Sequence, residues 1–480
     1  MAARGMIPSD ARANEEETLG ARRRRLRARS TSKASIVDLP MEVVQDVLAR
    51  AVARSPSGAI AAARLARVST LFRDAIYRDP ELFWIDIDMS SRSCAPTDAR
   101  VKAMCERGTW KAARFINFAG CEKLTDEALR AVALGCPNLR DVVFSGGKFT
   151  KAGLEEFARR GGFRSVTLDL TSKALKPSDA LVVLRAFIAH SHETLEKLSC
   201  GREAPYSPAE RRAFSLASTQ LFNGVKKCTN LKVLDFTNCG EDVRFPLYDI
   251  QRHCPHVEEL KLNCFGGDPG WTIAGQAPPD FEDTCWRKLR VCEVAVAMET
   301  TSVGYRLGNS NVDDAALISI LYGSIETIEV LDVTGCSHLG HWGAVVWDKL
   351  PINLKRLRCA RTPLACDDAV RHILAHLCPA LEDLEVSCIG AAAAQITDDA
   401  FLAFAPGTGP PLALRTLHVA GSGVTAKALR ALCASCALAR FPRLRAVDLS
   451  ACRSLSRAVR RVAVDLFPND NVRALERASL

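Results

Sequence analysis

Two absences limit what this 480-residue chain can be. It contains no apolar run of about 18 residues or more, which argues against a membrane-spanning helix. No basic segment followed by an apolar core stands at its start, so we expect no secretory signal. Without secretion, we expect the 19 cysteines to be reduced thiols rather than a disulfide framework. The expected location is therefore the cytoplasm, the nucleus or both.

Motifs that carry chemistry are missing too. The sequence has no GxxxxGK[ST], GxSxG or GxGxxG pattern. Cys433-x-x-Cys436 has the spacing of metal ligands but lacks a second cysteine pair in a suitable context. His372-x-x-x-His376 lacks the glutamate of a zinc hydrolase, because Ile373 holds that place. We therefore expect neither enzymatic activity nor a metal or cofactor.

Positive charge is concentrated at the start of the chain. Residues 1–35 hold nine Lys and Arg and four acids. The net positive charge of this segment is more than half of the chain's formal charge of +9. Residues 1–34 have few large apolar side chains and are expected to be disordered. ARRRRLRAR (21–29) fits a nuclear-import signal and a solvated basic tail equally well. The remaining charge is nearly balanced, so we expect no nucleic-acid binding by the folded body.

Order is expected to begin at residue 35 with a short helical segment. Pro40 suits the first turn of a helix, and Glu42 follows where the helix dipole favours a negative charge. Helical spacing predicts one apolar stripe made of Val43, Val44, Val47, Leu48 and Val52. After a break at residues 55–58, a second helical pattern covers 59–77, and DPELFWIDIDM (79–89) closes the segment.

This segment resembles an F-box, the module that docks a cullin ubiquitin ligase onto a substrate receptor. The residues that carry the resemblance are Leu39-Pro40-x-Glu42-Val43-Val44-x-x-Val47-Leu48, Leu65-x-x-Val68 with Phe72, and Leu82-Phe83-Trp84. The segment departs from the family at Gly58-Ala59-Ile60, where an Asp-Leu pair is usual. The resemblance implies a hydrophobic surface for a Skp-type adaptor, formed by Leu39, Pro40, Val43, Val44, Val47, Leu48, Val68 and Trp84. A generic helical hairpin is the alternative.

A repeated pattern, apolar-x-x-apolar-x-apolar, fills the rest of the chain. It occurs twelve times, at residues 113–118, 139–144, 163–168, 195–200, 231–236, 257–262, 289–294, 328–333, 354–359, 381–386, 414–419 and 444–449. Five of the eleven intervals lie between 24 and 27 residues, which is close to the range of leucine-rich repeats. Five of the intervening segments open with an apolar residue followed by a Thr or Asp that can cap a helix, at 124–133, 149–158, 312–321, 396–405 and 424–433.

Each unit therefore reads as strand, turn and helix, and only stacking can bury both elements. The predicted fold is an α/β solenoid, curved, with parallel strands on the concave face and helices outside. It resembles the cysteine-containing leucine-rich repeats that follow an F-box. The predicted domains are a basic tail (1–34), an F-box (35–90), a connecting segment (91–112) and a solenoid of about twelve units (113–480).

The cysteines follow the repeats. Thirteen of the 19 occupy repeat positions, including the +8 position counted from the strand start (Cys121, Cys239, Cys336, Cys452) and the −3 position (Cys136, Cys228, Cys254, Cys378). Phe441 takes the −3 position in the last unit, so this position favours a buried apolar side chain. We interpret these cysteines as core residues whose thiols make weak hydrogen bonds to turn backbone.

The concave face is the predicted site of partner binding. From the fifth strand onward its exposed positions carry more acids than bases, which favours a basic segment on a protein partner. The candidate residues are Asp235, Glu259, Glu293, Asp332 and Glu385. Trp271, in the Gly/Pro-rich insertion 265–281, fits either a partner anchor or a cover over a gap in the stack. A merely solvated charged face is the alternative.

The resemblance implies a substrate-recognition subunit of an SCF-type ubiquitin ligase, joined through a Skp-type adaptor to a cullin scaffold. Two other classes stay open. One is a repeat scaffold or assembly protein without a ligase role, and the other is a nucleic-acid-associated adaptor anchored by its basic tail.

Overall fold

The computed structural model describes residues 39–53, 58–90, 96–169, 175–201, 219–237, 244–265, 272–273, 280–297, 299–301, 304–306, 312–336, 338–339, 353–373, 379–388, 396–402, 412–437, 441–457 and 459. Predicted features outside these residues are the basic tail 1–34, Cys239, Trp271, His376 and Cys378. The chain divides into a helical unit, Met1–Ile85, and a repeat unit, Asp86–Leu480.

The helical unit contains α2 (Met41–Ala53), α3 (Gly58–Leu65), α4 (Thr70–Arg78) and α5 (Pro80–Phe83). α2 begins directly after Pro40, as predicted, with Glu42 in its first turn. The single helical pattern expected over 59–77 is instead divided into α3 and α4. Ser69 accounts for the division, because its Oγ accepts a hydrogen bond from the Phe72 amide at 3.1 Å and caps α4.

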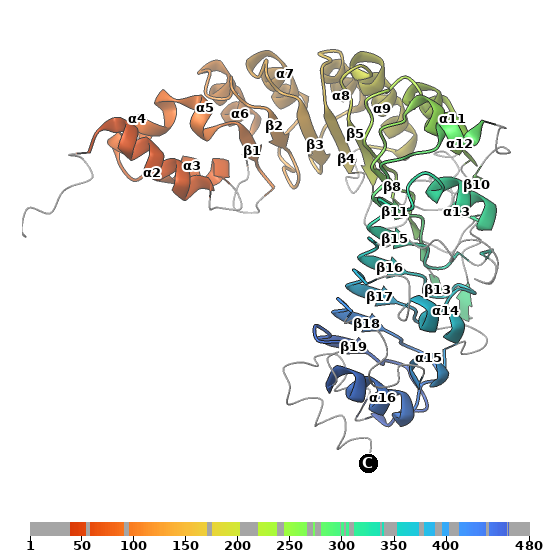
Figure 1. Cartoon of the computed structure of the whole chain (residues 1–480). Helices are drawn as coiled ribbons and strands as arrows, with labels where there is room; N and C mark the ends of the chain where they lie inside the picture. Colours follow the sequence, from red (N-terminus) through yellow and green to blue (C-terminus); the bar gives the residue numbers. More distant parts are fainter. Residues whose placement is uncertain are drawn as a thin grey trace, which may run out of the picture. The chain divides into compact units, whose positions relative to one another are not determined.

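A thirteen-stranded parallel sheet runs through the repeat unit (Figure 1). Its strands, in spatial order, are β1 (Asp86–Asp88), β2 (Phe115–Asn117), β3 (Asp141–Ser145), β4 (Ser165–Asp169), β5 (Lys197–Gly201), β6 (Val233–Asp235), β8 (Glu259–Lys261), β11 (Val291–Glu293), β15 (Val330–Asp332), β16 (Arg356–Arg358), β17 (Asp383–Glu385), β18 (Thr416–His418) and β19 (Ala446–Asp448). All twelve predicted strands are present. The register aligns equivalent positions of neighbouring strands, from Asn117 beside Val143 to His418 beside Asp448.

The thirteenth strand, β1, comes from residues that the sequence pattern placed at the end of the F-box. Asp86 and Asp88 alternate with Ile87, which has the period of a strand, and Ile87 pairs with Ile116 of β2. Short additional pairs form between β7 (Arg244–Phe245) and β10 (Thr272–Ile273), β9 (Cys264–Phe265) and β12 (Val296–Ala297), and β13 (Glu299–Thr301) and β14 (Gly304–Arg306).

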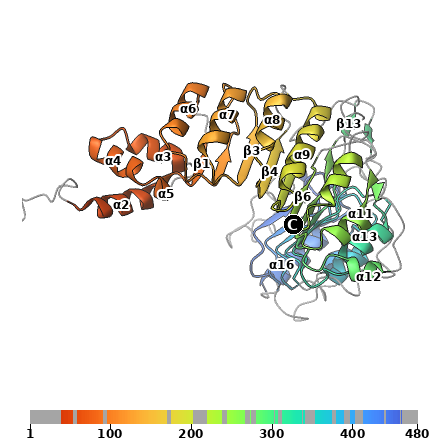
Figure 2. The ribbon, with the colours of Figure 1, turned by 90° about the horizontal axis from the view of Figure 1, so that it is seen from above.

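The helices of the repeat unit lie along one side of this sheet (Figures 1 and 2). They are α6 (Asp98–Glu106), α7 (Asp126–Gly135), α8 (Lys151–Ala158), α9 (Pro177–Ser191), α11 (Leu247–His253), α12 (Phe281–Thr284), α13 (Asp314–Leu321), α14 (Asp367–His372), α15 (Asp399–Leu402) and α16 (Ala426–Ala437). The five helix starts predicted from Thr and Asp caps are confirmed in α7, α8, α13, α15 and α16. Asp313, for example, accepts a hydrogen bond from the Ala316 amide at 2.8 Å. None of the described helices has the length and apolar character needed to cross a membrane.

The prediction of core cysteines is confirmed where the chain is described. All the cysteines recorded there are free, and all but one are buried. The +8 thiols of Cys336 and Cys452 donate to the carbonyls of Val294 and Val419, each at 3.4 Å. Both carbonyls belong to the preceding repeat, so these weak hydrogen bonds connect neighbouring units.

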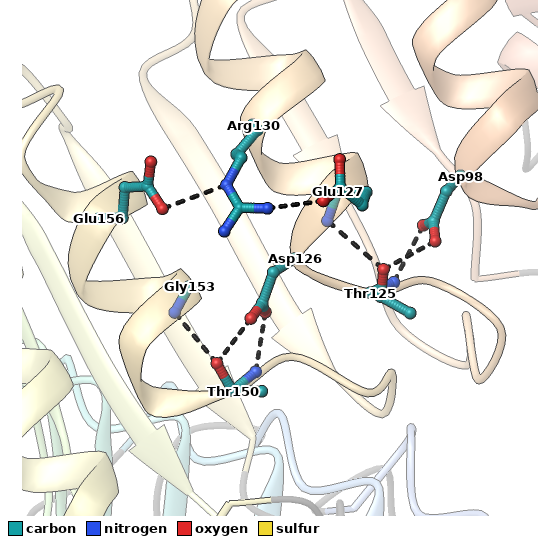
Figure 3. Close-up of polar contacts among 8 residues, drawn as sticks. All are labelled: Asp98, Thr125, Asp126, Glu127, Arg130, Thr150, Gly153 and Glu156. Carbon is teal, nitrogen blue, oxygen red and sulfur yellow. Dashed lines mark hydrogen bonds and ion pairs between the residues drawn. The ribbon is translucent and has the colours of Figure 1, made fainter.

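Carboxylates at helix starts also connect consecutive repeats (Figure 3). Each accepts two hydrogen bonds, of 2.6–2.9 Å, from the amide and the hydroxyl of one threonine in the next repeat. The pairs are Asp98–Thr125, Asp126–Thr150, Asp367–Thr397 and Asp398–Thr425. Since each threonine also caps its own helix, three successive helices are joined in series at two places in the unit.

Candidate functional site

The helical unit has its own small core, which contains three of the residues predicted to contact an adaptor. Val44, Leu48 and Trp84 are 0%, 3% and 2% exposed. The Trp84 ring stacks on Tyr77 with 5.8 Å between the ring centroids. α2 is further held to α4 by Gln45, whose Nε2 donates to the Ala75 carbonyl at 3.1 Å. The structure thus places these three residues in the core rather than on a surface, because an apolar stripe includes the side chains that face the unit itself.

The other predicted adaptor contacts are exposed. Leu39, Pro40, Val43, Val47 and Val68 all lie at the surface of the helical unit. Val43 and Val47 are one turn apart, so they lie on the same solvent-facing side of α2. This side of α2 therefore presents two neighbouring apolar side chains to solvent, next to the helix face that is buried.

Two further apolar side chains lie at the surface of the helical unit. Leu82 and Tyr77 are exposed as well, and neither was among the predicted adaptor contacts. Over the described part of the chain, six of the nine exposed large apolar side chains belong to the helical unit: Leu39, Val43, Val47, Val68, Tyr77 and Leu82. We call these six the exposed apolar set. Within Leu82-Phe83-Trp84 the sequence did not reveal which residue faces solvent, because the choice depends on how α5 packs.

The sheet face opposite the helices, here called the open face, presents the first and last residues of each three-residue strand. From β6 to β19 it carries seven carboxylates and three Lys or Arg side chains: Asp235, Glu259, Lys261, Glu293, Asp332, Arg356, Arg358, Asp383, Glu385 and Asp448. His418 adds one imidazole, 3.7 Å from Asp383 and 3.7 Å from Asp448. The register therefore brings the five predicted acidic candidates onto one face.

Several of these acids already have partners within the face. The Asp235 carboxylate accepts from Ser199 Oγ at 3.0 Å and from Thr237 Oγ1 at 2.8 Å. Glu293 lies 4.0 Å from the ammonium of Lys261. Such pairing reduces the acidic character of the face but leaves acids in excess.

Asp332 and Glu385 differ in their surroundings. Burial raises the pKa of the Asp332 carboxyl, while hydrogen bonds from Thr334 act in the opposite direction. Glu385 is 3.5 Å from Arg358, and Glu259 is 3.9 Å from Lys261. Glu259 and Glu385 thus make only loose ion pairs, and they are the predicted acids best placed to meet a partner.

Three features of the sequence lie outside the described side chains. Trp271 lies outside the described residues, as do the side chains of His372, Cys433 and Cys436. Among the side chains that are described, no group of three or more His, Cys, Asp or Glu is arranged to hold a metal ion.

Comparison with known proteins shows similarity to solved structures but not to a known family. No protein-family model matches the sequence, and no curated protein is significantly similar to it. A crystal structure of the yeast Rad7 and Elc1 complex contains a similar chain, with a TM-score of 0.42 and 13% identity over 88% of this chain and 96% of that one. The evidence for the repeat architecture is therefore the parallel sheet of this protein itself. The chain is an α/β solenoid of leucine-rich-repeat type, preceded in the sequence by a separate helical unit.

Proposed function

We propose that this chain is the substrate receptor of an SCF-type ubiquitin ligase. Its helical unit binds a Skp-type adaptor, and its repeat unit binds the protein to be modified. The chain itself carries out no chemistry, since its role is to hold the target near the ubiquitin-loaded enzyme of the ligase. The observation that carries the proposal is the exposed apolar set. A helical unit this small, with apolar side chains left in water, is typical of a module that a partner completes.

A pull-down with purified Skp-type adaptor tests this docking. Val43→Asp/Val47→Asp in the full chain places two charges on the exposed side of α2 without touching its buried face. We expect adaptor capture to fall at least about tenfold, since an unpaired charge at an apolar interface costs well over 1.4 kcal/mol.

Leu134→Asp is the matched control, because Leu134 is a fully exposed leucine on α7 of the repeat unit. Thermal unfolding should be unchanged in both variants. Docking through α2 is ruled out if the double variant captures adaptor as well as the wild type, or if Leu134→Asp loses as much.

The open face supports the second half of the proposal, a target with a basic segment. Glu259→Lys/Glu385→Lys should weaken binding of a fluorescent octalysine peptide about tenfold at low salt, because each change reverses a surface charge in reach of the ligand. Glu122→Lys/Glu193→Lys alters net charge equally at exposed acids elsewhere and should have less than about a twofold effect. Equal losses in both double variants would mean that net charge alone, and not the open face, attracts the peptide.

A further inference from the structure

A row of charged residues runs along one edge of the sheet, and each of them directly precedes a strand. We call it the edge row: Arg114, Arg140, Arg164, Glu196, Lys232, Glu258, Arg290, Glu329, Lys355, Glu382, Arg415 and Arg445. From Arg140 onward, each residue donates its backbone amide to the backbone carbonyl of the previous member at 2.7–2.9 Å. Consecutive members are therefore direct neighbours in space. Their side chains form a continuous line across the repeats.

From Glu196 to Arg415 the signs alternate, and neighbours form ion pairs. Lys232 lies 3.0 Å from Glu196, and Glu329 lies 3.0 Å from Arg290 and 2.9 Å from Lys355. Arg290 and Lys355 lower the pKa of the Glu329 carboxyl by hydrogen bonding to its charged form. A shallow pocket of about 440 Å³ opens along this stretch. Its lining includes equal numbers of acids and bases, so it has no preference for either sign.

The first three members break this alternation. Arg114, Arg140 and Arg164 are all exposed and adjacent, and like charges side by side repel. Arg164 lies 3.4 Å from Asp141, whereas Arg114 and Arg140 make no ion pair with any described residue. A fourth cation, Arg160, interacts with Arg140. Burial lowers the pKa of the Arg160 guanidinium, and the positive charge of Arg140 lowers it further.

We propose that Arg114, Arg140 and Arg164 form a binding edge for an acidic segment of a partner protein. Successive strands are about 4.8 Å apart, so the two ends of this triplet are separated by about 10 Å. An extended peptide advances about 3.3 Å per residue, so acids at positions i and i+3 span the same distance. Arginine is suited to this task because its planar fork binds carboxylates through two parallel hydrogen bonds.

The surroundings favour a short acidic peptide over a nucleic acid. Asp86, Asp88 and Asp141 lie on the strands next to the triplet, and Glu196 ends it. A nucleic-acid backbone needs a continuous basic track, and these carboxylates limit the basic stretch to the about 10 Å of the triplet, which suits a short acidic segment. The proposal rests on the repeat unit being the partner-binding part of the chain, but it is independent of adaptor docking.

The test is fluorescence anisotropy on the full chain with a labelled octaglutamate peptide. Arg114→Glu/Arg140→Glu should weaken binding by about tenfold or more at low salt, and raised salt should weaken binding to the wild type. Arg443→Glu/Arg453→Glu is the matched control, because both are exposed arginines outside the edge row, at the far end of the repeats, and give the same change in net charge. It should stay within about twofold of the wild type.

Three results would overturn the proposal: no binding of octaglutamate to the wild type, equal losses in the two double variants, or tighter and triplet-dependent binding of a single-stranded oligonucleotide. Adaptor pull-down separates this proposal from the preceding one. Arg114→Glu/Arg140→Glu should retain the adaptor, and Val43→Asp/Val47→Asp should retain octaglutamate.

Discussion

The carboxylate of Asp126 holds Thr150 of the next repeat with both of its oxygens. One oxygen accepts the Thr150 amide at 2.8 Å, and the other accepts its hydroxyl at 2.6 Å (Figure 3). Thr150 in turn caps α8 by accepting a hydrogen bond from the Gly153 amide at 3.1 Å. A helix in one repeat thereby orients the start of the helix in the next, which is a nearest-neighbour coupling of the kind that stabilises solenoids.

Substituting Asp126 or Thr150 should reveal this coupling as a loss of stability. Asp126→Ala and Thr150→Ala are each expected to lower the free energy of unfolding by about 1 kcal/mol, the usual cost of a lost helix cap. In a double-mutant cycle followed by urea unfolding, the combined loss should be smaller than the sum by about 1 kcal/mol. Glu122→Ala, at an exposed acid, should have little effect. Strict additivity of the two changes would show that the contact contributes no coupling.

Gly153 lies where a larger residue would disturb the same contact. A Cβ added to Gly153 would lie 2.1 Å from Cγ of Asp126. Alanine in a helix normally gains about 1 kcal/mol over glycine, but here Gly153→Ala should destabilise by about 1–2 kcal/mol because it displaces the carboxylate.

The sign should reverse in the Asp126→Ala background, where the clash is absent and the helix preference of alanine remains. Urea unfolding of the four variants measures both effects. A stabilising Gly153→Ala in the wild-type background would contradict the close approach.

Arg160, which lies between α8 and β4, binds the backbone of the turn before β3. Its guanidinium donates to the carbonyls of Leu139 at 2.7 Å, Cys136 at 2.9 Å and Pro137 at 2.7 Å. It also lies 5.3 Å from the centre of the Phe163 ring. Arg160→Ala should therefore reduce the free energy of unfolding by about 2 kcal/mol, since charged hydrogen bonds to covered carbonyls are lost.

Arg160→Lys should restore less than half of this loss, because an ammonium lacks the planar fork that reaches three acceptors. Arg159→Ala removes an exposed neighbour and serves as the control. Full rescue by lysine would show that charge, and not the fork, matters at this position.

Stability should fall at high pH because of two buried thiols. Burial raises the pKa of Cys228 and of Cys254 from 9.0 to about 12. At a pH between these two pKa values, the thiol is ionised in the unfolded state and protonated in the folded state. The unfolded state then binds fewer protons, so the free energy of unfolding falls as the pH rises.

The expected slope is about 1.4 kcal/mol per thiol for each pH unit above 9. Urea unfolding at pH 8, 9 and 10, values chosen around the unfolded pKa, should show this decline in the wild type. It should be smaller in Cys228→Ala/Cys254→Ala. An identical decline in that variant would assign the alkaline loss to other groups.

The sequence by itself determined the repeat architecture. Strand positions, helix caps and core cysteines follow from apolar spacing and local hydrogen bonding, so they can be read within one unit of about 26 residues. The placement of Asp235, Glu259 and Glu293 on the open face followed as well, although the register aligns Asp235 and Glu293 with Lys261 rather than with Glu259.

The tertiary structure decided which side chains are free to act. Val43 and Val44 are chemically alike and adjacent, yet only Val43 is exposed, because α3, α4 and α5 cover one side of α2. The Asp126–Thr150 pair and the placement of Arg114 beside Arg140 each join residues that are more than 20 positions apart in the chain. Local spacing carries no information about such pairs, since they arise only when one repeat is stacked on the next.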